Sequence, residues 1–352
     1  MQVGISAVVT AWNNSLSVCR CLDSLRTAGI REVVLCDCGS EDDTVEIVAR
    51  EYPGVPILSR DQKINFAQAR NLGLAKTREP LVLFVDGDWI AGADCICELE
   101  NKLLSCDRFA VAVPRFQNED GTFQIGHNVR RFPSNRALCT ELLLLHKLLP
   151  NNPATPHYRM MDFPHDRDCV VEHACGAFVL TRRDALVEIG GYDECYAPAW
   201  MEDVDLHRRL ASRGWRTIFC ADAAAIHTGR ETSRHFIIEH RYHDFYRSVL
   251  RYCRIHLPDA CQMVRISMAV GMLLRILFSY VFPGWLRPRL LRRYGIYNSD
   301  RAIQSYKQMY FQVLRLAIQG GRDVSPGKPS DAAVGVSGGK TRFAQQAASS
   351  HD

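Results

Sequence analysis

The feature that most constrains the fold is an alternation of short apolar runs with amphipathic stretches, which continues from residue 1 to about residue 228. Short apolar runs are typical of strands buried in a parallel sheet, and the amphipathic stretches between them are typical of covering helices. The alternation begins with VGISAVVT, LSVCRCLDSLRTAG, REVVLCDCGS and DDTVEIVAREY. Further strand candidates are PILSR, LVLFVD, FAVAVP, AFVLT and RTIFC. The pattern predicts the α/β fold class.

Composition divides the chain of 352 residues into three parts. Residues 1–228 are the predicted α/β domain, residues 229–316 a basic helical extension, and residues 317–352 a disordered tail rich in Gly, Ser, Ala, Asp and Lys. The net charge of +4, from 43 Lys and Arg against 39 Asp and Glu, is too small to indicate a nucleic-acid partner. Residues 230–315, however, contain 15 basic and 5 acidic side chains. We therefore expect the extension to meet an anionic partner.

Residues 264–286 of the extension are strongly apolar but do not form a simple membrane span. A span needs about 20 uninterrupted apolar residues, whereas Arg265 and Arg275 bound the first half of this segment and Pro283 interrupts the second. Four arginines follow at once: Arg287, Arg289, Arg292 and Arg293. This arrangement predicts a helix in peripheral contact with an anionic membrane. The alternative is packing in the protein core or against another copy.

The 14 cysteines are scattered, and their Cys-x-Cys pairs lack the spacing of zinc sites, so we expect reduced thiols. No secretory signal precedes the first apolar run, which begins at Val3. Both observations predict a cytoplasmic location.

Two carboxylates, Asp86 and Asp88, end the strand candidate LVLFV. Burying them at a strand end costs free energy unless a cation or a fixed donor compensates. Mg²⁺ or Mn²⁺ suits carboxylate oxygens and completes its coordination with phosphate oxygens. An Asp-x-Asp pattern also occurs by chance and in acidic turns, so the surrounding residues are needed to distinguish a metal site from these alternatives.

Three further stretches supply that context. Asp37 closes the second strand candidate, before a Gly-Ser turn into a helix whose amino terminus can face a phosphate or a base edge. Arg70 lies between that strand and the aspartate pair, and a buried arginine needs an anion. Glu202 and Asp203 stand at a predicted helix start, where the helix dipole stabilises carboxylates.

With these residues in place, the sequence resembles the family-2 glycosyltransferases, nucleotide-sugar-dependent enzymes of the GT-A fold, and among them the rhamnosyltransferase-like branch. The matching stretches occur in the family's order and cover about residues 3–228: VVTAWNN, LCDCGSEDDT, ARNLGLA, FVDGD, GAFVLTRR, GGYDE, EDVDLHRRLASRGWR and AAAIH. The resemblance implies that residues 1–228 form a GT-A catalytic domain, with a mostly parallel central sheet flanked by helices. Residues 229–316 would then be a C-terminal helical extension.

For the donor, the resemblance implies that Trp12 packs on the nucleotide base, Asp37 hydrogen-bonds the base edge and Arg70 meets the nucleotide. Asp86 would lie near the ribose or the metal, and Asp88 would hold the Mn²⁺ or Mg²⁺ ion that bridges the diphosphate. Simpler interpretations stay open, with Trp12 as a packed aromatic and Asp37 as a turn cap.

For the acceptor, the resemblance implies that Asp203 is the general base and that the neighbouring Glu202 orients the acceptor. His227 would help to bind the metal or the diphosphate. A base is needed because an acceptor hydroxyl is a poor nucleophile at neutral pH. The two acids could instead be charges at a helix amino terminus, and His227 a hydrogen-bonded histidine without a ligand.

The implied function is inverting, metal-dependent transfer of a sugar from a UDP- or dTDP-sugar to an acceptor hydroxyl in cell-envelope polysaccharide or glycolipid assembly. The basic extension would approach a glycan or lipid-linked acceptor at the cytosolic face of a membrane. The loop region of residues 117–168 should set acceptor specificity, because this stretch is long and irregular. A non-catalytic nucleotide-sugar-binding scaffold is an alternative. So is a nucleotidyltransferase, although no Gly-rich phosphate loop follows the first strand candidate.

Overall fold

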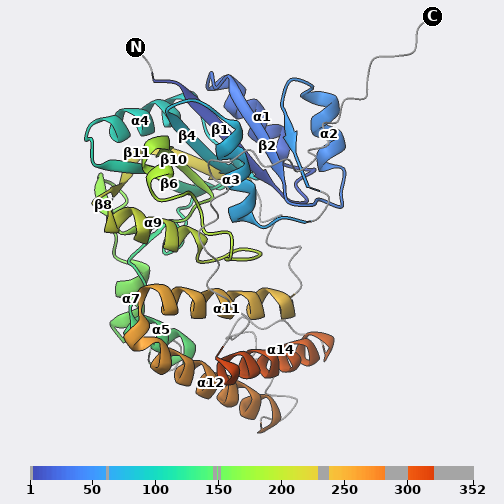
Figure 1. Ribbon diagram of the computed structural model, residues 1–352, viewed down its shortest axis with the longest axis vertical. Coiled ribbons are helices and arrows are strands. Elements are labelled where there is room, and N and C mark those ends of the chain that lie inside the picture. The colour runs from blue at the N-terminus through green and yellow to red at the C-terminus, as the bar shows by residue number, and fades with distance from the viewer. Residues whose placement is uncertain are drawn as a thin grey trace, which may run out of the picture.

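The centre of the protein is a nine-stranded sheet in the computed structural model, which describes residues 3–60, 63–145, 149, 152–228, 238–281 and 300–320 (Figure 1). Its strands are β1 (Ile5–Ala11), β2 (Glu32–Asp37), β3 (Ile57–Leu58), β4 (Leu81–Asp86), β5 (Trp89–Ile90), β6 (Phe109–Asn118), β8 (Cys169–Val171), β10 (Phe178–Arg182) and β11 (Arg216–His227). Their spatial order is β3-β2-β1-β4-β10-β6-β11-β5, and β8 pairs with β11. A small second sheet pairs β7 (Val129–Arg130) with β9 (His173–Ala174).

The helices fall into two groups. Those within the α/β domain are α1 (Val18–Thr27), α2 (Thr44–Glu51), α3 (Phe66–Lys76), α4 (Ala93–Leu104), α5 (Asn135–Leu142), α7 (Ala154–Arg159), α8 (Arg183–Glu188) and α9 (Glu202–Ser212). Those of the extension are α11 (Ile238–His256), α12 (Pro258–Val281) and α14 (Asp300–Gln319). Figure 1 shows the sheet in the upper part of the molecule, with α11, α12 and α14 below it.

Strand pairing is parallel from β3 to β4 and between β6 and β11, and antiparallel around β10. β1 pairs in parallel with β2 and β4, and β6 with β11, whereas β10 is antiparallel to β4 and β6. The first five residues of β4, LVLFV, are buried, as expected for a strand covered on both faces. The predicted α/β class and the mostly parallel sheet are therefore confirmed. The candidate PILSR is shorter than predicted, because only Ile57–Leu58 pairs with β2.

This pairing brings the ends of several strands to one edge of the sheet. β2 ends at Asp37 and β4 at Asp86, and both residues lie opposite the carboxyl end of β1. β10 runs in the opposite direction, so its amino end, which Gly176 precedes, lies at the same edge. β11 ends at His227, which pairs with Trp89 just after the Asp-x-Asp stretch. In open α/β sheets, this edge is where ligands bind.

The extension forms a second hydrophobic core. Helices α11, α12 and α14 pack on one another, and α12 also packs on α5. Buried side chains of this core include Val249, Met268 and Val313. Val204 joins them from the first turn of α9, the helix that carries the two candidate acids. The extension is thus packed directly against the candidate site.

Ion pairs between α9 and α11 strengthen this packing. Asp205 is 1% exposed, and its carboxylate lies 2.7 Å from His256 Nε2 and 2.7 Å from Arg209 Nε. Burial disfavours the charged carboxylate, but the hydrogen bond with His256 and the charge of Arg209 hold the pKa of Asp205 below its usual range. Arg251 of α11 donates to Asp193, in the loop before α9, at 2.9 Å. The position of α9 therefore depends on α11.

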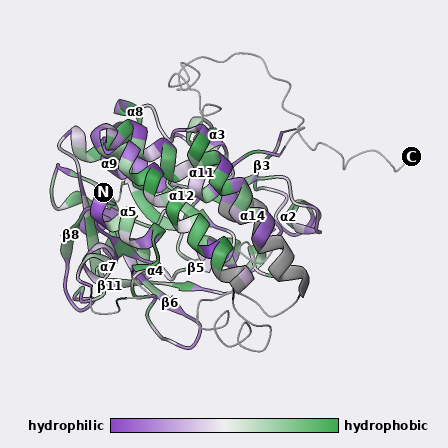
Figure 2. Cartoon of the chain, turned by 90° about the horizontal axis from the view of Figure 1, so that it is seen from below, coloured by the Kyte–Doolittle hydropathy of each residue, from purple (hydrophilic) through white to green (hydrophobic). Residues whose placement is uncertain are grey.

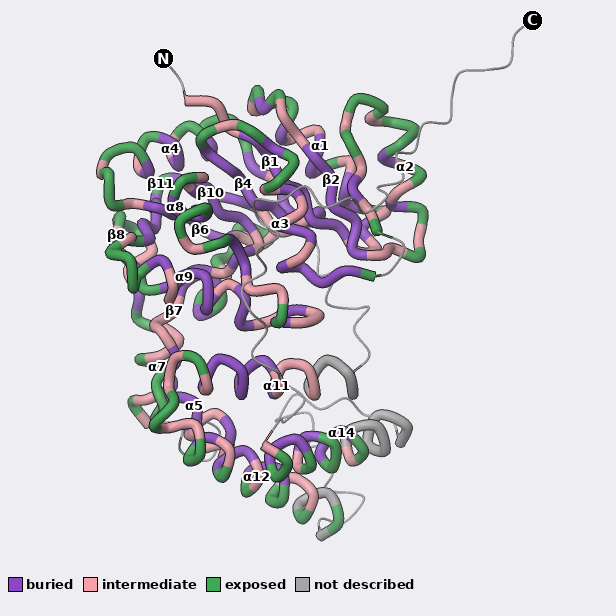
Figure 3. Tube along the Cα trace, viewed as in Figure 1, coloured by how far each residue is buried: buried purple, intermediate pink, exposed green. Residues whose placement is uncertain are grey.

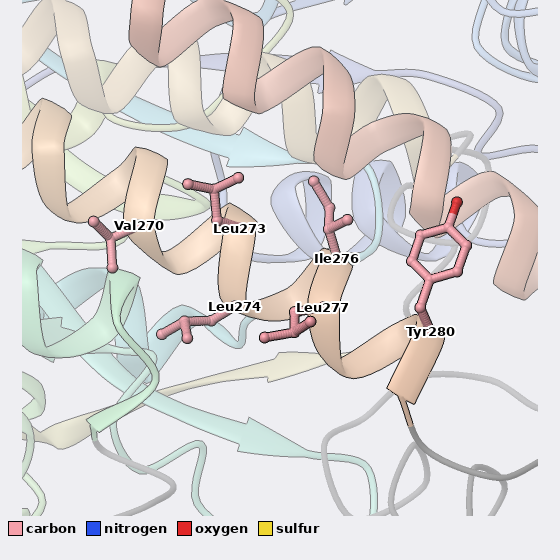
Figure 4. A pocket seen from close by; sticks show the side chains of 6 residues that line it. All are labelled: Val270, Leu273, Leu274, Ile276, Leu277 and Tyr280. Carbon is pink, nitrogen blue, oxygen red and sulfur yellow. The ribbon is translucent and has the colours of Figure 1, made fainter.

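Helix α12 packs one side on the second hydrophobic core, through residues such as Met268, and leaves other apolar residues exposed. Among the described residues, its segment Pro258–Leu277 is long and apolar enough to cross a membrane. A single helix of this kind is only weak evidence that the protein spans a membrane. Arg265 and Arg275 turn inward, where they donate to the carbonyl oxygens of Ala317 at 3.2 Å and Leu142 at 2.7 Å. Figure 2 shows α12 as a largely hydrophobic helix, and Figure 3 shows exposed stretches along it. Five exposed apolar residues and the partly buried Ile276 line an open groove on this helix (Figure 4): Val270, Leu273, Leu274, Leu277 and Tyr280.

Some predictions about the carboxyl-terminal part lie outside the described residues. These are the structure at the domain boundary, residues 229–237, the four arginines that follow the apolar segment, and the tail beyond residue 320. α14 continues to Gln319, three residues past the predicted end of the extension at residue 316. The division into a catalytic domain, an extension and a tail stays a prediction.

Candidate active site

Arg70 lies at the centre of the candidate site. Its side chain is 3% exposed, and it donates to Asp86 Oδ1 at 3.2 Å and to Glu202 Oε1 at 3.4 Å. Helix α3 carries Arg70 in its second turn and begins at a capping box made by Asn65, which fixes the start of the helix. The ring centroid of Tyr192 lies 5.4 Å from the guanidinium carbon. One buried cation therefore links α3, the end of β4 and the start of α9.

The carboxylates around Arg70 outnumber it. Burial and the charge of Asp88 raise the pKa of Asp86 to about 6, although Arg70 opposes the rise. Burial and the charge of Asp203 raise the pKa of Glu202 to about 7, again against Arg70. Glu202 Oε2 has no hydrogen-bond partner among the described residues. Glu202 therefore takes up a proton close to neutral pH.

Asp203 is partly exposed, in contrast to its neighbour. Its carboxylate accepts hydrogen bonds from the backbone N–H of Val204 at 2.7 Å and of Gly176 at 3.3 Å. A Cβ at Gly176 would lie 2.9 Å from Arg70 Nη1 and 3.4 Å from Asp203 Cβ, so a glycine is needed for this close approach. Met201, just before the acids, has a φ of 69°, a conformation that costs a non-glycine residue about 1–3 kcal/mol. The local backbone is thus constrained to present Asp203 at the sheet edge.

Asp88 and His227 face each other at the other end of this edge. Asp88 is 4% exposed, and its Oδ2 lies 3.1 Å from His227 Nε2. The other ring nitrogen of His227 lies 3.1 Å from Gln124 Nε2, and the ring stacks on Trp89 with centroids 4.6 Å apart. The backbone N–H of Thr228 donates to Asp88 O at 2.8 Å. Both side chains are therefore held in place before any ligand binds.

The donor set of Asp88 and His227 fits a divalent cation whose coordination is completed by a ligand. Within the part of the chain that the structure describes, no three His, Cys, Asp or Glu side chains gather in metal-binding geometry. The carboxylate oxygen and the imidazole nitrogen converge, however, and both are donors for Mn²⁺-like ions. Two protein ligands leave the remaining positions for phosphate oxygens and water.

Asp37 and Trp12 lie at the ends of neighbouring strands. Asp37 is 5% exposed and accepts hydrogen bonds from the backbone N–H groups of Gly39 at 3.0 Å and Ser40 at 3.2 Å. Trp12 is partly buried against the main core. The turn cap and the packed aromatic, the simpler interpretations of these residues, are thus both observed. Contacts of either residue with a nucleotide base stay predictions.

The sequence predicts no role for several residues of the site. Gln124 contacts His227 across 103 positions of the chain. His207 Nδ1 donates to Asp203 O at 2.8 Å, and the ring of Tyr192 packs on Arg70. Each of these roles arises from a tertiary contact, so spacing along the chain could not reveal it.

The raised pKa of Glu202 predicts a pH-dependent effect of Glu202→Gln on stability. Because the pKa rises on folding, ionisation of Glu202 progressively destabilises the folded protein as the pH rises from about 4.5 to about 7. The neutral glutamine does not ionise, so the variant should gain thermal stability relative to the parent as the pH is raised from 5 to 8. Thermal melts in that range test this, and a difference that does not change with pH would contradict it.

Residues 6–190, more than half of the chain, match the model of the family Glycosyl transferase family 2. The chain is 29% identical, over 62% of its length and 75% of the other protein, to the N-acetylglucosaminyl-diphospho-decaprenol L-rhamnosyltransferase of Mycobacterium tuberculosis. It is 24% identical to the rhamnosyltransferase WbbL of Escherichia coli, over 58% of this chain and 75% of that protein.

Among solved structures, the mannosyltransferase of Pyrobaculum calidifontis in complex with GDP-Man and Mn²⁺ aligns with a TM-score of 0.49 and 13% identity, over 92% of this chain and 88% of that chain. The family match contains Asp37, Arg70, Asp86 and Asp88 and ends before the two acids of α9. The chain therefore belongs to the family-2 glycosyltransferases, with the GT-A fold and with rhamnosyltransferases among its relatives.

Proposed function

We propose that the protein is an inverting, divalent-metal-dependent glycosyltransferase of cell-envelope polysaccharide or glycolipid assembly. It transfers a sugar from a UDP- or dTDP-sugar to a hydroxyl of a glycan or lipid-linked acceptor. The observation that carries this proposal is the approach of the accessible Asp203 to the Arg70–Asp86–Glu202 group, at the sheet edge that also holds Asp88. The M. tuberculosis relative is named for a lipid-linked diphosphate acceptor, which supports an acceptor of that class here.

The donor would occupy the ends of β1, β2 and β4. In this proposal Trp12 packs on the nucleotide base, Asp37 accepts a hydrogen bond from the base edge, and Asp86 lies near the ribose. Arg70 contributes to nucleotide binding by holding the Asp86 carboxylate in place. A divalent ion on Asp88 and His227 would neutralise the charge that develops on the leaving diphosphate.

Asp203 is the better candidate for the general base. A base must reach the acceptor hydroxyl, and Asp203 is partly exposed whereas Glu202 is 7% exposed and bound to Arg70. The two N–H donors on the Asp203 carboxylate also orient it. Glu202 would instead orient the acceptor from behind Asp203.

The reaction follows from this arrangement. The acceptor oxygen attacks the anomeric carbon and loses its proton to Asp203, while the bond from that carbon to the diphosphate oxygen breaks. A base on the side opposite the leaving group favours a single displacement, which inverts the anomeric configuration. The bound substrates are held in position for attack, which removes most of the entropic cost of bringing them together.

Two substitutions should separate donor binding from transfer. Asp203→Asn removes the base but keeps its size and polarity, so kcat should fall about 100- to 10,000-fold while affinity for the donor stays close to that of the parent. Asp88→Ala removes a ligand of the cation, so the Mn²⁺-dependent part of donor binding should disappear. Calorimetric titration with UDP- and dTDP-sugars, with and without Mn²⁺, measures binding, and release of nucleoside diphosphate measures turnover.

Asp184→Asn is a matched control, because this exposed aspartate stands in the first turn of α8, at the opposite end of β10 from Gly176, and its carboxylate also accepts from the backbone N–H of the next residue. It should behave like the parent in both measurements. Near-normal turnover of Asp203→Asn would show that another group is the base. Donor binding by Asp88→Ala that still responds to Mn²⁺ would remove Asp88 from the metal site.

We also propose that the outer side of α12 contacts an anionic membrane, where a lipid-linked acceptor would reside. The apolar residues on this side are between 41% and 59% exposed, whereas the two arginines of the helix are bonded inside the protein. Lys307 of α14 lies 4.0 Å from the ring centroid of Tyr280, so a cation accompanies the apolar surface. An apolar surface with adjacent cations is typical of interfacial helices.

Substitution on this surface should weaken membrane binding. Leu273→Asp and Leu277→Asp each remove an apolar contact, so partition into vesicles of phosphatidylcholine with phosphatidylglycerol should fall about tenfold or more. Val187→Asp on α8 is a matched control, because Val187 is 58% exposed and Leu277 59% exposed. Flotation with the vesicles measures binding. Equal binding by all variants would contradict the proposed contact, and loss of a dimer in sedimentation would assign the surface to a second copy.

A further inference from the structure

The small β7–β9 sheet brings a set of basic and aromatic side chains next to the candidate base. Arg130 in β7 lies opposite His173 in β9. Asn128 anchors this sheet to β6 of the main one, because its side chain accepts from Phe116 N at 3.1 Å and donates to Pro114 O at 3.2 Å. Arg130 is thus held on a rigid element and not on a free loop.

Ring contacts continue from this sheet to α9. The ring of His173 lies 6.0 Å from that of Phe132 and 6.3 Å from that of His207, measured between centroids. The guanidinium carbon of Arg208 lies 4.8 Å from the Phe132 ring centroid. His207 is bonded to the backbone of Asp203. The two arginines therefore flank a group of rings that lies beside the candidate base.

Arg130 and Arg208 differ from neighbouring arginines in lacking a carboxylate partner. Arg131 pairs with Glu172 at 3.5 Å and Arg209 with Asp205 at 2.7 Å. Among the described residues, no ion pair joins Arg130 or Arg208 to a carboxylate, although Arg130 Nε donates to the carbonyl oxygen of Gly126 at 2.7 Å and its Nη2 lies 3.3 Å from His127 Nδ1. Both side chains are partly exposed. Guanidinium groups with spare donors are the preferred protein ligands for phosphate oxygens.

Buried polar atoms beside the two arginines also lack partners. His173 is 4% exposed and His207 is 2% exposed. Neither ring nitrogen of His173, nor Nε2 of His207, has a hydrogen-bond partner among the described residues. Buried nitrogens of this kind are normally satisfied, so their presence indicates a ligand or ordered water at this place.

Helix geometry fixes where Arg208 lies on α9 relative to Asp203 and Val204. From Asp203 to Arg208 the helix advances by about 7.5 Å. Arg208 follows Val204 by one turn, and Val204 is buried in the core of the extension. Arg208 therefore lies on the side of α9 that packs on the extension, one turn beyond Val204 and about 140° around the helix from Asp203.

We propose that Arg130 and Arg208 bind the diphosphate of a lipid-linked acceptor whose sugar hydroxyl is presented to Asp203 and whose lipid lies along α12. This inference rests on the proposed function and adds the acceptor's charged group to it. It also explains why α9 is packed on the extension: one helix then carries both the base and a ligand for the acceptor diphosphate. Residues 117–168, predicted to set acceptor specificity, supply Arg130.

The test compares two acceptors that differ in the diphosphate. The probes are N-acetylglucosaminyl-diphospho-farnesol and the uncharged octyl N-acetylglucosaminide, assayed with the same donor. The ratio of kcat/KM for the first acceptor to that for the second should fall about tenfold or more in Arg130→Gln and in Arg208→Gln, as expected for loss of a charge-assisted hydrogen bond. Arg208→Lys should recover part of the ratio, because it restores the charge without the planar guanidinium.

The control is Arg213→Gln, which removes an exposed arginine at the end of α9 and should keep the parental ratio. Thermal melts of each variant identify any that fail to fold, and for these the Lys variant at the same position replaces Gln. An unchanged ratio in both arginine variants, with an active parent, would overturn the diphosphate site. A parent that transfers sugar to neither acceptor and binds no nucleotide sugar would instead overturn the proposed function.

Discussion

The buried guanidinium of Arg70 is the interaction on which the rest of the site depends. It joins α3, the end of β4 and the start of α9, and it is the cation that the acids Asp86 and Glu202 both contact. Removing one partner of a buried pair leaves an uncompensated charge, which is strongly destabilising. Gly176 permits this arrangement, because any side chain at that position would meet the guanidinium. The excess of carboxylates beside Arg70 leaves negative charge that can favour a further cation.

The topology of the sheet explains why residues far apart in the sequence meet. Parallel strands place Asp37 and Asp86 at one edge, and the antiparallel β10 returns Gly176 to it. The long β11 brings His227 to Asp88 from the other side. The extension packs on the first turn of α9, the helix that carries Asp203. The proposed donor residues on the main sheet and the proposed base on α9 thus have separate structural supports.

The α/β class, most strands and the position of α9 could be predicted from the sequence, because buried apolar runs and helix starts leave local signals. The pairing of Asp88 with His227 followed only from a resemblance, since the two residues lie 139 positions apart. Gln124, His173 and Arg208 could not be predicted, because their surroundings are made by tertiary contacts. The sequence indicates that Arg70, if buried, needs an anion, but it does not show that Asp86 and Glu202 supply it, since the chain offers several acids. The inward direction of Arg265 and Arg275 was likewise hidden, as it depends on carbonyl groups of α14 and α5.

The central claim is single displacement of a nucleoside diphosphate by an acceptor hydroxyl with Asp203 as the base. The most direct measurement is proton NMR of the anomeric signal during transfer from the UDP- or dTDP-sugar that the protein binds in the presence of Mn²⁺. The account predicts a product whose anomeric configuration is opposite to that of the donor from the first turnover. A product that retains the donor configuration would contradict it, because retention requires a mechanism in which Asp203 does not act as the base of one displacement.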